Sequence, residues 1–203
     1  MAETQVVSDA QKLAANLGAL PEAQVQPAFI VVSGLPGTGK SHFCYQLAER
    51  LPLVILNSDA LRKTLFPSPS YRAEESGRLF QAIHRLIEDL LKKGIPLVLD
   101  ATNLSERYRE HLYRIADRQE ARLILVRVEA PAEVVYERLQ ARSGEDYPEN
   151  HSDADWSVFQ KLRPTVERIR RHHFAVNTSQ DITPRPKKDS ERSQPVKGDF
   201  KWR

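Results

Sequence analysis

A glycine-rich stretch that follows a short apolar run constrains this chain more than any other feature of its sequence. The apolar run is Phe29–Val32, and the stretch after it, Gly34-Leu35-Pro36-Gly37-Thr38-Gly39-Lys40-Ser41, matches the pattern G-x-x-x-x-G-K-[ST]. Its glycines let backbone N–H groups converge on a phosphate, and the helix that it opens adds partial positive charge. Lys40 is then placed to reach the β- and γ-phosphates and Ser41 to hold Mg²⁺. All eight residues are therefore predicted to bind a nucleotide.

The rest of the chain alternates short apolar runs with longer segments of helical periodicity. The predicted strands are Ala28–Ser33, Leu53–Leu56, Leu97–Leu99, Leu123–Val128 and Phe174–Val176. The predicted helices are Lys40–Arg50, Ala60–Phe66, Glu74–Lys93, Glu106–Gln119, Pro131–Arg142 and Ser157–Arg171. This alternation predicts an α/β fold in which a parallel sheet of about five strands is flanked by helices.

Segments outside this pattern lie at both ends, so the predicted domain is 28–180. Residues 1–27 form an N-terminal extension with a short helix over Ser8–Leu20, for which Ser8 is the expected N-cap. Residues 181–203 carry seven Lys/Arg and four Asp/Glu, which accounts for the net charge of +3 and leaves residues 1–180 formally neutral. With little aliphatic content, this basic tail is predicted to be disordered.

Composition excludes several classes of protein. A single cysteine, Cys44, cannot form an intramolecular disulfide, and the six histidines lack zinc-ligand spacing. The apolar runs are far shorter than the roughly 18 residues of a membrane span, and the first residues lack a secretory pattern. These features predict a soluble cytoplasmic protein without a membrane partner, and they leave its oligomeric state open.

Two acidic residues follow predicted strands. Asp59 comes shortly after Leu53–Leu56, and Asp100 comes directly after Leu97–Leu99. Because the carboxyl ends of parallel strands share one edge of a sheet, both are expected beside the phosphate-binding stretch. Asp59 is a candidate general base for an attacking hydroxyl, or alternatively the cap of the next helix. Asp100 is in the position that holds Mg²⁺ or its waters, or alternatively is a turn residue.

Arginines supply the remaining candidate charges. Arg62, one helical turn after the first acidic residue, is placed to hold an anionic group of an acceptor, unless it is a solvated helix residue. Arg138 and Arg142 are spaced i, i+4 before a polar stretch, which predicts an arginine-bearing lid that neutralises charge during phosphoryl transfer. The alternative is that Arg138 pairs with Glu133 or Glu137.

Two further side chains each keep two interpretations. Trp156 either stacks on adenine or packs the base of the lid against the core. Asn177, after the last predicted strand, either approaches the edge of the adenine or belongs to a plain turn.

In combination, these residues resemble the kinase module of 5′-hydroxyl polynucleotide kinases and the small ATP-binding proteins similar to it. The segments that carry the resemblance are Gly34–Ser41, Ser58-Asp59-x-x-Arg62, Asp100-x-Thr102-Asn103, Arg138-Leu139-x-x-Arg142 and Ser152-Asp153-Ala154-Asp155-Trp156. Zeta-toxin-like, gluconate and chloramphenicol kinases are more distant relatives. The resemblance covers roughly residues 28–179.

The resemblance implies a P-loop NTPase fold that uses ATP with Mg²⁺. It also implies that Asp59 is the general base, that Arg62 contacts a phosphate of the acceptor and that Asn103 lies near the acceptor. Lys40 and a lid arginine would stabilise the transferring phosphoryl group.

The predicted function is therefore ATP-dependent phosphotransfer to a hydroxyl group, with the 5′-OH of RNA or DNA as the favoured acceptor. A small metabolite or antibiotic is the alternative acceptor. A second class of function is an ATPase or nucleotide switch without an acceptor, which would need a residue that positions water in place of a base at Asp59.

Overall fold

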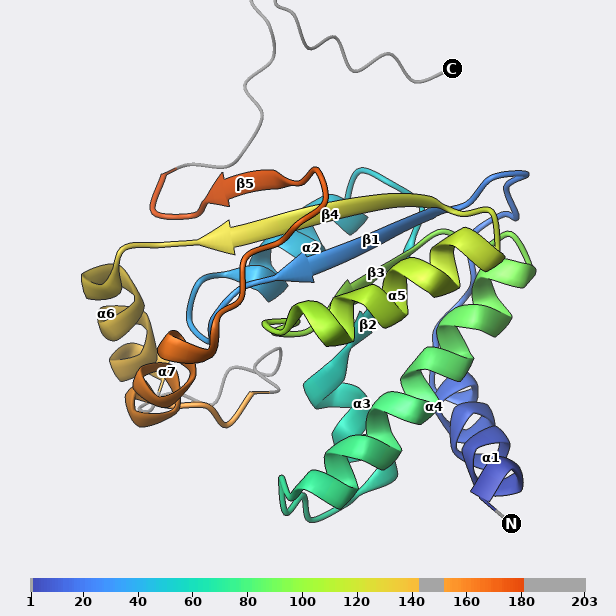
Figure 1. Ribbon diagram of the computed structural model, residues 1–203, viewed down its shortest axis with the longest axis horizontal. Coiled ribbons are helices and arrows are strands. Elements are labelled where there is room, and N and C mark those ends of the chain that lie inside the picture. The colour runs from blue at the N-terminus through green and yellow to red at the C-terminus, as the bar shows by residue number, and fades with distance from the viewer. Residues whose placement is uncertain (1, 143–151, 181–203) are drawn as a thin grey trace, which may run out of the picture.

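All five predicted strands form one parallel sheet in the computed structural model, which describes residues 2–142 and 152–180 (Figure 1). The strand order is β2-β3-β1-β4-β5, and every neighbouring pair is parallel. The strands are β1 (Ala28–Ser33), β2 (Val54–Asn57), β3 (Leu97–Asp100), β4 (Arg122–Glu129) and β5 (Phe174–Asn177). The predicted α/β fold class is thereby confirmed.

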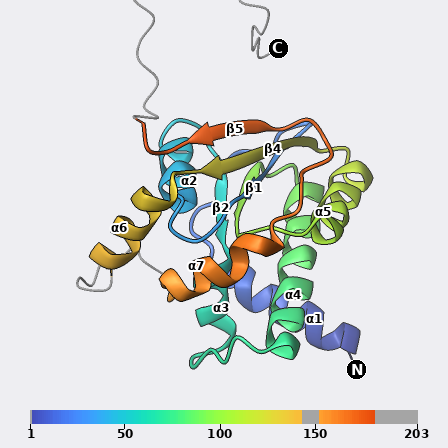
Figure 2. The same ribbon diagram turned by 60° about the vertical axis from the view of Figure 1, so that its left-hand side comes forward.

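Helices cover both faces of this sheet and its carboxyl edge (Figure 1, Figure 2). One face packs against α4 and α5 and the other against α2, while α6 and α7 lie beyond the carboxyl ends of β1 and β4. The helices are α1 (Ala2–Ala15), α2 (Lys40–Ala48), α3 (Ser58–Leu65), α4 (Ala73–Lys92), α5 (Glu106–Arg118), α6 (Ala132–Arg142) and α7 (Trp156–Leu162).

The side chains of the central strand β1 are buried on both faces of the sheet, which explains why its sequence is apolar throughout. Phe29 and Val31 point into the layer of α4 and α5, whereas Ile30 and Val32 point into the layer of α2. All four are almost fully buried. Burial of each such side chain stabilises the fold by about 1.5–3 kcal/mol, and this fixes the strand that carries the phosphate-binding stretch.

The N-terminal helix differs from its prediction. It begins at Ala2 rather than Ser8 and ends at Ala15, so that Ser8 lies inside it and is not its N-cap. Asp9 next to Ser8 is fully buried, and its carboxylate accepts bonds of 2.6 and 2.9 Å from the Arg78 guanidinium of α4. This pair and the buried Leu13 tie the second half of the helix to α4.

The last predicted helix is also shorter than expected. α7 ends at Leu162 and passes through a 3₁₀ turn, Arg163–Thr165, because Pro164 offers no N–H to continue the helix. The chain that follows is held by Arg109, whose guanidinium donates to the carbonyls of Glu167 and Arg168. The prediction of a helix up to Arg171 was therefore wrong.

The predicted tail, 181–203, lies outside the described residues, as do residues 143–151 of the polar stretch after Arg142. Among the helices that the structure describes, none combines the length and the apolar character needed to cross a membrane.

Candidate active site

A cavity of about 310 Å³ lies at the carboxyl edge of the sheet, between the phosphate-binding stretch, α3 and α6. It brings together ten of the predicted functional residues, which are Pro36, Gly37, Gly39, Lys40, Ser41, Asp59, Arg62, Asp100, Arg138 and Arg142. The register of the sheet explains why these residues lie together, because Asp100 lies opposite Val32 of β1 on one side and opposite Asn57 of β2 on the other.

The phosphate-binding stretch has the backbone that its glycines predict. Gly39 has a left-handed φ of 84° where it opens α2, and a Cβ there would lie 3.0 Å from the Thr178 hydroxyl. A Cβ at Gly34 would lie 2.3 Å from the carbonyl oxygen of Val128. Side chains at these positions would displace the loop, so the glycines let it pass close to β4 and to the turn after β5.

Lys40 is folded back onto this loop. Its ammonium donates a 2.9 Å hydrogen bond to the carbonyl oxygen of Leu35. Burial lowers the pKa of Lys40, and the nearby carboxylates Asp100 and Asp59 oppose that effect. The charge is therefore held at the loop by two acidic neighbours.

An oxygen-rich cluster adjoins Lys40. The Ser41 hydroxyl and the Asn57 amide both donate to the same carboxylate oxygen of the buried Asp100, each at 2.6 Å. Hydroxyl and carboxylate oxygens are the ligands that Mg²⁺ prefers, so Ser41 and Asp100 are suited to hold it directly or through its waters. Sequence reasoning missed Asn57, although an Asn at the junction of a strand and a helix is a recognisable capping signal.

Asn57 also decides between the two interpretations of Asp59. Its side-chain oxygen accepts bonds from the backbone N–H groups of Asp59 and Ala60, at 3.1 and 2.9 Å, so Asn57 is the N-cap of α3. Asp59 lies within the first turn, and its carboxylate lines the cavity. Burial raises the pKa of Asp59, against a hydrogen bond from Ser152 and the charge of Lys40, which lower it.

Arg62 lies on the same wall of the cavity and is only 7% exposed. Its guanidinium is paired with Glu75, donates to the Ser76 hydroxyl at 3.3 Å and stacks 4.8 Å from the centre of the Tyr71 ring. Its buried Nε has no hydrogen-bond partner among the described residues. Hydrogen bonds, with Ser70 the largest contributor, hold the pKa of Glu75 at about 2, so this carboxylate stays ionised. Arg62 is thus a positioned residue, not a solvated one.

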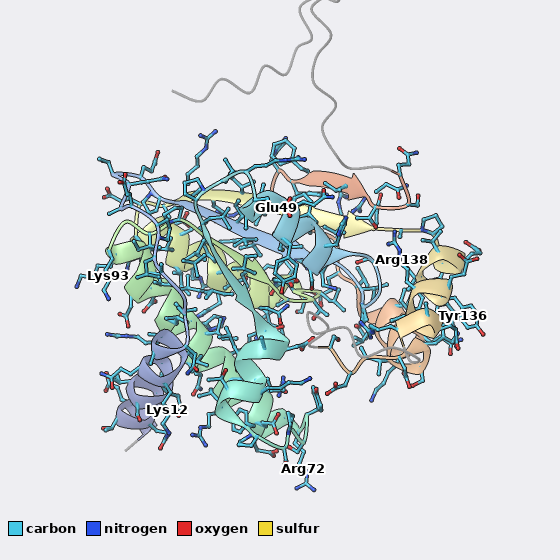
Figure 3. The ribbon with its side chains drawn as sticks, turned by 180° about the vertical axis from the view of Figure 1, so that it is seen from behind. Lys12, Glu49, Arg72, Lys93, Tyr136 and Arg138 are labelled. Carbon is cyan, nitrogen blue, oxygen red and sulfur yellow. The ribbon has the colours of Figure 1, made fainter. Side chains whose placement is uncertain are left out.

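The two arginines of α6 also line the cavity. Figure 3 labels one of them, Arg138, on this helix. Arg138 donates to the hydroxyl and the carbonyl oxygen of Thr178, at 2.9 and 2.7 Å, rather than to Glu133 or Glu137. Arg142 donates to the carbonyl oxygen of Ala154, and burial lowers its pKa. Their closure as a lid remains a prediction.

Two other candidates have local partners. Trp156 stacks on Phe159 with ring centres 4.7 Å apart and meets the edge of Tyr136, as the packing interpretation requires. The Asn177 side chain accepts from the backbone and hydroxyl of Ser179, which is a turn. Neither residue is among the described residues that line the cavity.

Asn103 was expected near the acceptor, but its amide points into the protein and donates to the carbonyl of Val32 at 2.7 Å. A left-handed φ of 44° turns the chain at this residue, and its carbonyl accepts from Ser33 and Arg109. Asn103 therefore holds the loop after β3 against β1, outside the described lining of the cavity.

Solved structures, those of kinases among them, share this fold. A gluconokinase from Sinorhizobium meliloti 1021 is 25% identical, with a TM-score of 0.54 over 77% of this chain and 86% of its own. Kti12 of Chaetomium thermophilum, solved with ADP-AlF3, is 19% identical, with a TM-score of 0.56 over 76% of this chain and 91% of its own. One chain of the Pnkp1/Rnl/Hen1 RNA repair complex is 21% identical, with a TM-score of 0.54, over 72% of this chain and 48% of its own.

These likenesses show a kinase-like P-loop fold. The AAA domain model AAA_33 matches residues 29–169, from β1 through the chain that follows α7, and thus includes every element that lines the cavity. The chain belongs to this AAA domain family.

Proposed function

We propose that this protein transfers the γ-phosphoryl group of ATP to a hydroxyl group of an acceptor. The observation that carries the proposal is the position of Asp59: a partly buried carboxylate, freed from helix capping by Asn57, faces the same cavity as Lys40 and the Ser41–Asp100 pair. A carboxylate across from a phosphate-binding loop is where an acceptor hydroxyl would lose its proton.

The reaction follows from these placements. The acceptor hydroxyl gives its proton to the Asp59 carboxylate while its oxygen bonds to the γ-phosphorus, and the bond from that phosphorus to the bridging oxygen of ADP breaks. Lys40 and the α6 arginines stabilise the charge on the transferring group and on the leaving ADP. Ser41 and Asp100 would hold Mg²⁺, which would supply positive charge to offset that of the phosphates.

We favour a 5′-OH of RNA or DNA as the acceptor. Arg62 supports this choice, because it is buried in the cavity wall on the Asp59 side and keeps one N–H unpartnered among the described residues. The similarity of fold to a chain of an RNA repair complex points in the same direction.

A small-molecule acceptor is the second candidate. Glu75 already compensates the charge of Arg62, which reduces the attraction for an anionic polymer, and a gluconokinase is among the structures with this fold. A plain ATPase is the third outcome, in which water takes the place of the acceptor.

The deciding experiment uses γ-labelled ATP with a panel of acceptors. The panel holds 5′-OH RNA and 5′-OH DNA, the same strands with a 5′-phosphate as matched controls, gluconate and simple alcohols, and a sample without acceptor. We expect label on the 5′-OH strands alone. Label on a small molecule alone would move the assignment to a metabolite kinase, and release of phosphate without any labelled acceptor would indicate an ATPase.

Salt dependence adds a second criterion. A polynucleotide acceptor should lose affinity steeply as salt rises, because each contacted phosphate releases counterions. Deleting 184–203, which carries the excess of positive charge, should reduce that slope and leave the chemistry intact. If the salt dependence of acceptor affinity were the same after the deletion, the tail would have no part in acceptor binding.

A further inference from the structure

Two segments distant in sequence meet beside the cavity. Tyr71, in the turn between α3 and α4, donates its hydroxyl to a carboxylate oxygen of Asp153 at 2.5 Å, and Lys63 of α3 lies 3.5 Å from the other oxygen. Asp153 belongs to residues 152–155, which precede α7. The contact thus joins the Arg62 wall of the cavity to the chain that follows α6.

Tyr71 makes this contact from an unfavourable backbone conformation. Its φ of 56° is left-handed, a conformation that a bulky residue adopts only when its surroundings impose it. Glu75 imposes it by accepting from the N–H groups of Ser70 and Tyr71, at 2.6 and 3.3 Å, and Arg62 stacks on the ring. The same carboxylate therefore orients both Arg62 and Tyr71.

Residues 152–154 reach into the cavity from the other end of the contact. Ser152 lines the cavity and from there lowers the pKa of Asp59, and the carbonyl of Ala154 accepts from Arg142. Asp153 lies between these two contacts and is held by Tyr71. Asp59, Arg62 and Arg142 are thereby connected through one short stretch of chain.

We propose that the Tyr71–Asp153 hydrogen bond is a clasp that holds residues 152–154 against Asp59 and so positions the acceptor side of the site. Tyr71 acts here as a positioning residue, since it works through Ser152 and Asp153. Both members of the pair are exposed: Tyr71 is 47% exposed and the Asp153 side chain is 58% exposed. The clasp can therefore open to admit an acceptor. The proposal rests on the phosphotransferase function proposed above.

Kinetics of Tyr71→Phe, which removes only the hydroxyl, test the positioning role. With a 5′-OH RNA oligonucleotide and, in parallel, gluconate as acceptors, we expect the acceptor KM to rise about three- to fivefold, the range for an exposed charged contact. The ATP Kd should stay unchanged. Asp153→Asn should give the same change, and the double variant should add little to either one. Tyr108→Phe, which removes a hydroxyl from a side chain 67% exposed on α5, is the matched control.

Fluorescence tests the clasp without any acceptor. Trp156 directly follows residues 152–155, and Trp202 is the other tryptophan of the chain. In a Trp202→Phe background, Tyr71→Phe should increase acrylamide quenching of Trp156, whereas Tyr108→Phe should not. Unchanged quenching would overturn the clasp even if no acceptor is phosphorylated. Increased quenching with unchanged acceptor kinetics would overturn its positioning role, as would an ATP Kd that rises together with the KM.

Discussion

Replacing Asp59 with Asn separates catalysis from stability more sharply than any other substitution in this protein. Asn is nearly isosteric with Asp but cannot take a proton from a hydroxyl. Because Asn57 already accepts the N–H groups at the start of α3, no helix cap is lost with the carboxylate. The predicted effect is therefore kinetic: kcat should fall about 10²-fold or more, which corresponds to at least about 2.7 kcal/mol of transition-state stabilisation.

Although kcat falls, the thermal stability of the Asp59→Asn variant should equal or exceed that of the wild type. Burial raises the folded-state pKa of Asp59 above its unfolded value, so at neutral pH the ionised carboxylate destabilises the fold. The amide introduced by Asp59→Asn carries no such charge, so this variant should melt no lower than the wild type at pH 8. The stability difference should shrink as pH falls through the folded pKa, because the wild-type carboxyl then becomes neutral as well.

Phosphotransfer from γ-labelled ATP, ATP titration and thermal melting at pH 8 and pH 5 measure the three quantities. The ATP Kd should change little, because the assigned phosphate contacts belong to the loop and to α6. Because Asn caps a helix about as well as Asp, Asp59→Ala is the variant that tests capping: had Asp59 been the cap, this change would cost about 1 kcal/mol and lower Tm by about 2–4 °C. A lower Tm with kcat nearly intact would refute the assignment of Asp59 as the base.

Three further substitutions test other parts of the site. Lys40→Ala should reduce phosphotransfer by about 10³-fold or more while circular dichroism stays native, since among the described residues the ammonium hydrogen-bonds only to the carbonyl of Leu35; residual turnover near wild type would contradict its role. Arg138→Lys should lower kcat more than it weakens ATP binding, because a single ammonium cannot reproduce the paired guanidinium contacts; equal losses in both would mean that Arg138 only holds the nucleotide. Arg109→Met should lower the free energy of unfolding in urea by about 3–5 kcal/mol. The guanidinium is 1% exposed, and its loss leaves buried Glu106 and several carbonyls unpaired. A loss below about 1 kcal/mol would contradict this reasoning.

Sequence reasoning succeeded where position along a strand decides position in space. The apolar runs placed the strands within one or two residues, and the shared edge of a parallel sheet then brought Asp59 and Asp100 to Lys40. Strand order was not predicted, and it matters here: β3 lies between β1 and β2, so Asp100 and not Asp59 is the direct neighbour of the phosphate-binding strand.

Sequence reasoning failed where a single dihedral angle, or a partner distant in sequence, determines where a side chain lies. Asn103 follows a strand like the catalytic candidates, yet its left-handed φ turns the amide back onto Val32. Arg138 has carboxylates near it along its own helix, yet it pairs with Thr178, 40 residues away. Tyr71 and Asp153 are 82 residues apart, and no local pattern indicates their contact.

The packing of α1 bears on how this protein can be produced in shortened form. The AAA domain match begins at residue 29, which invites truncation at that boundary. Such a truncation would remove Leu13 from the core and Asp9 from its pair with Arg78. It would also uncover part of the apolar face of α4, the helix that begins after the Tyr71 turn. Fragments that start at β1 are therefore expected to aggregate on expression, whereas those that start at Ala2 should stay in solution.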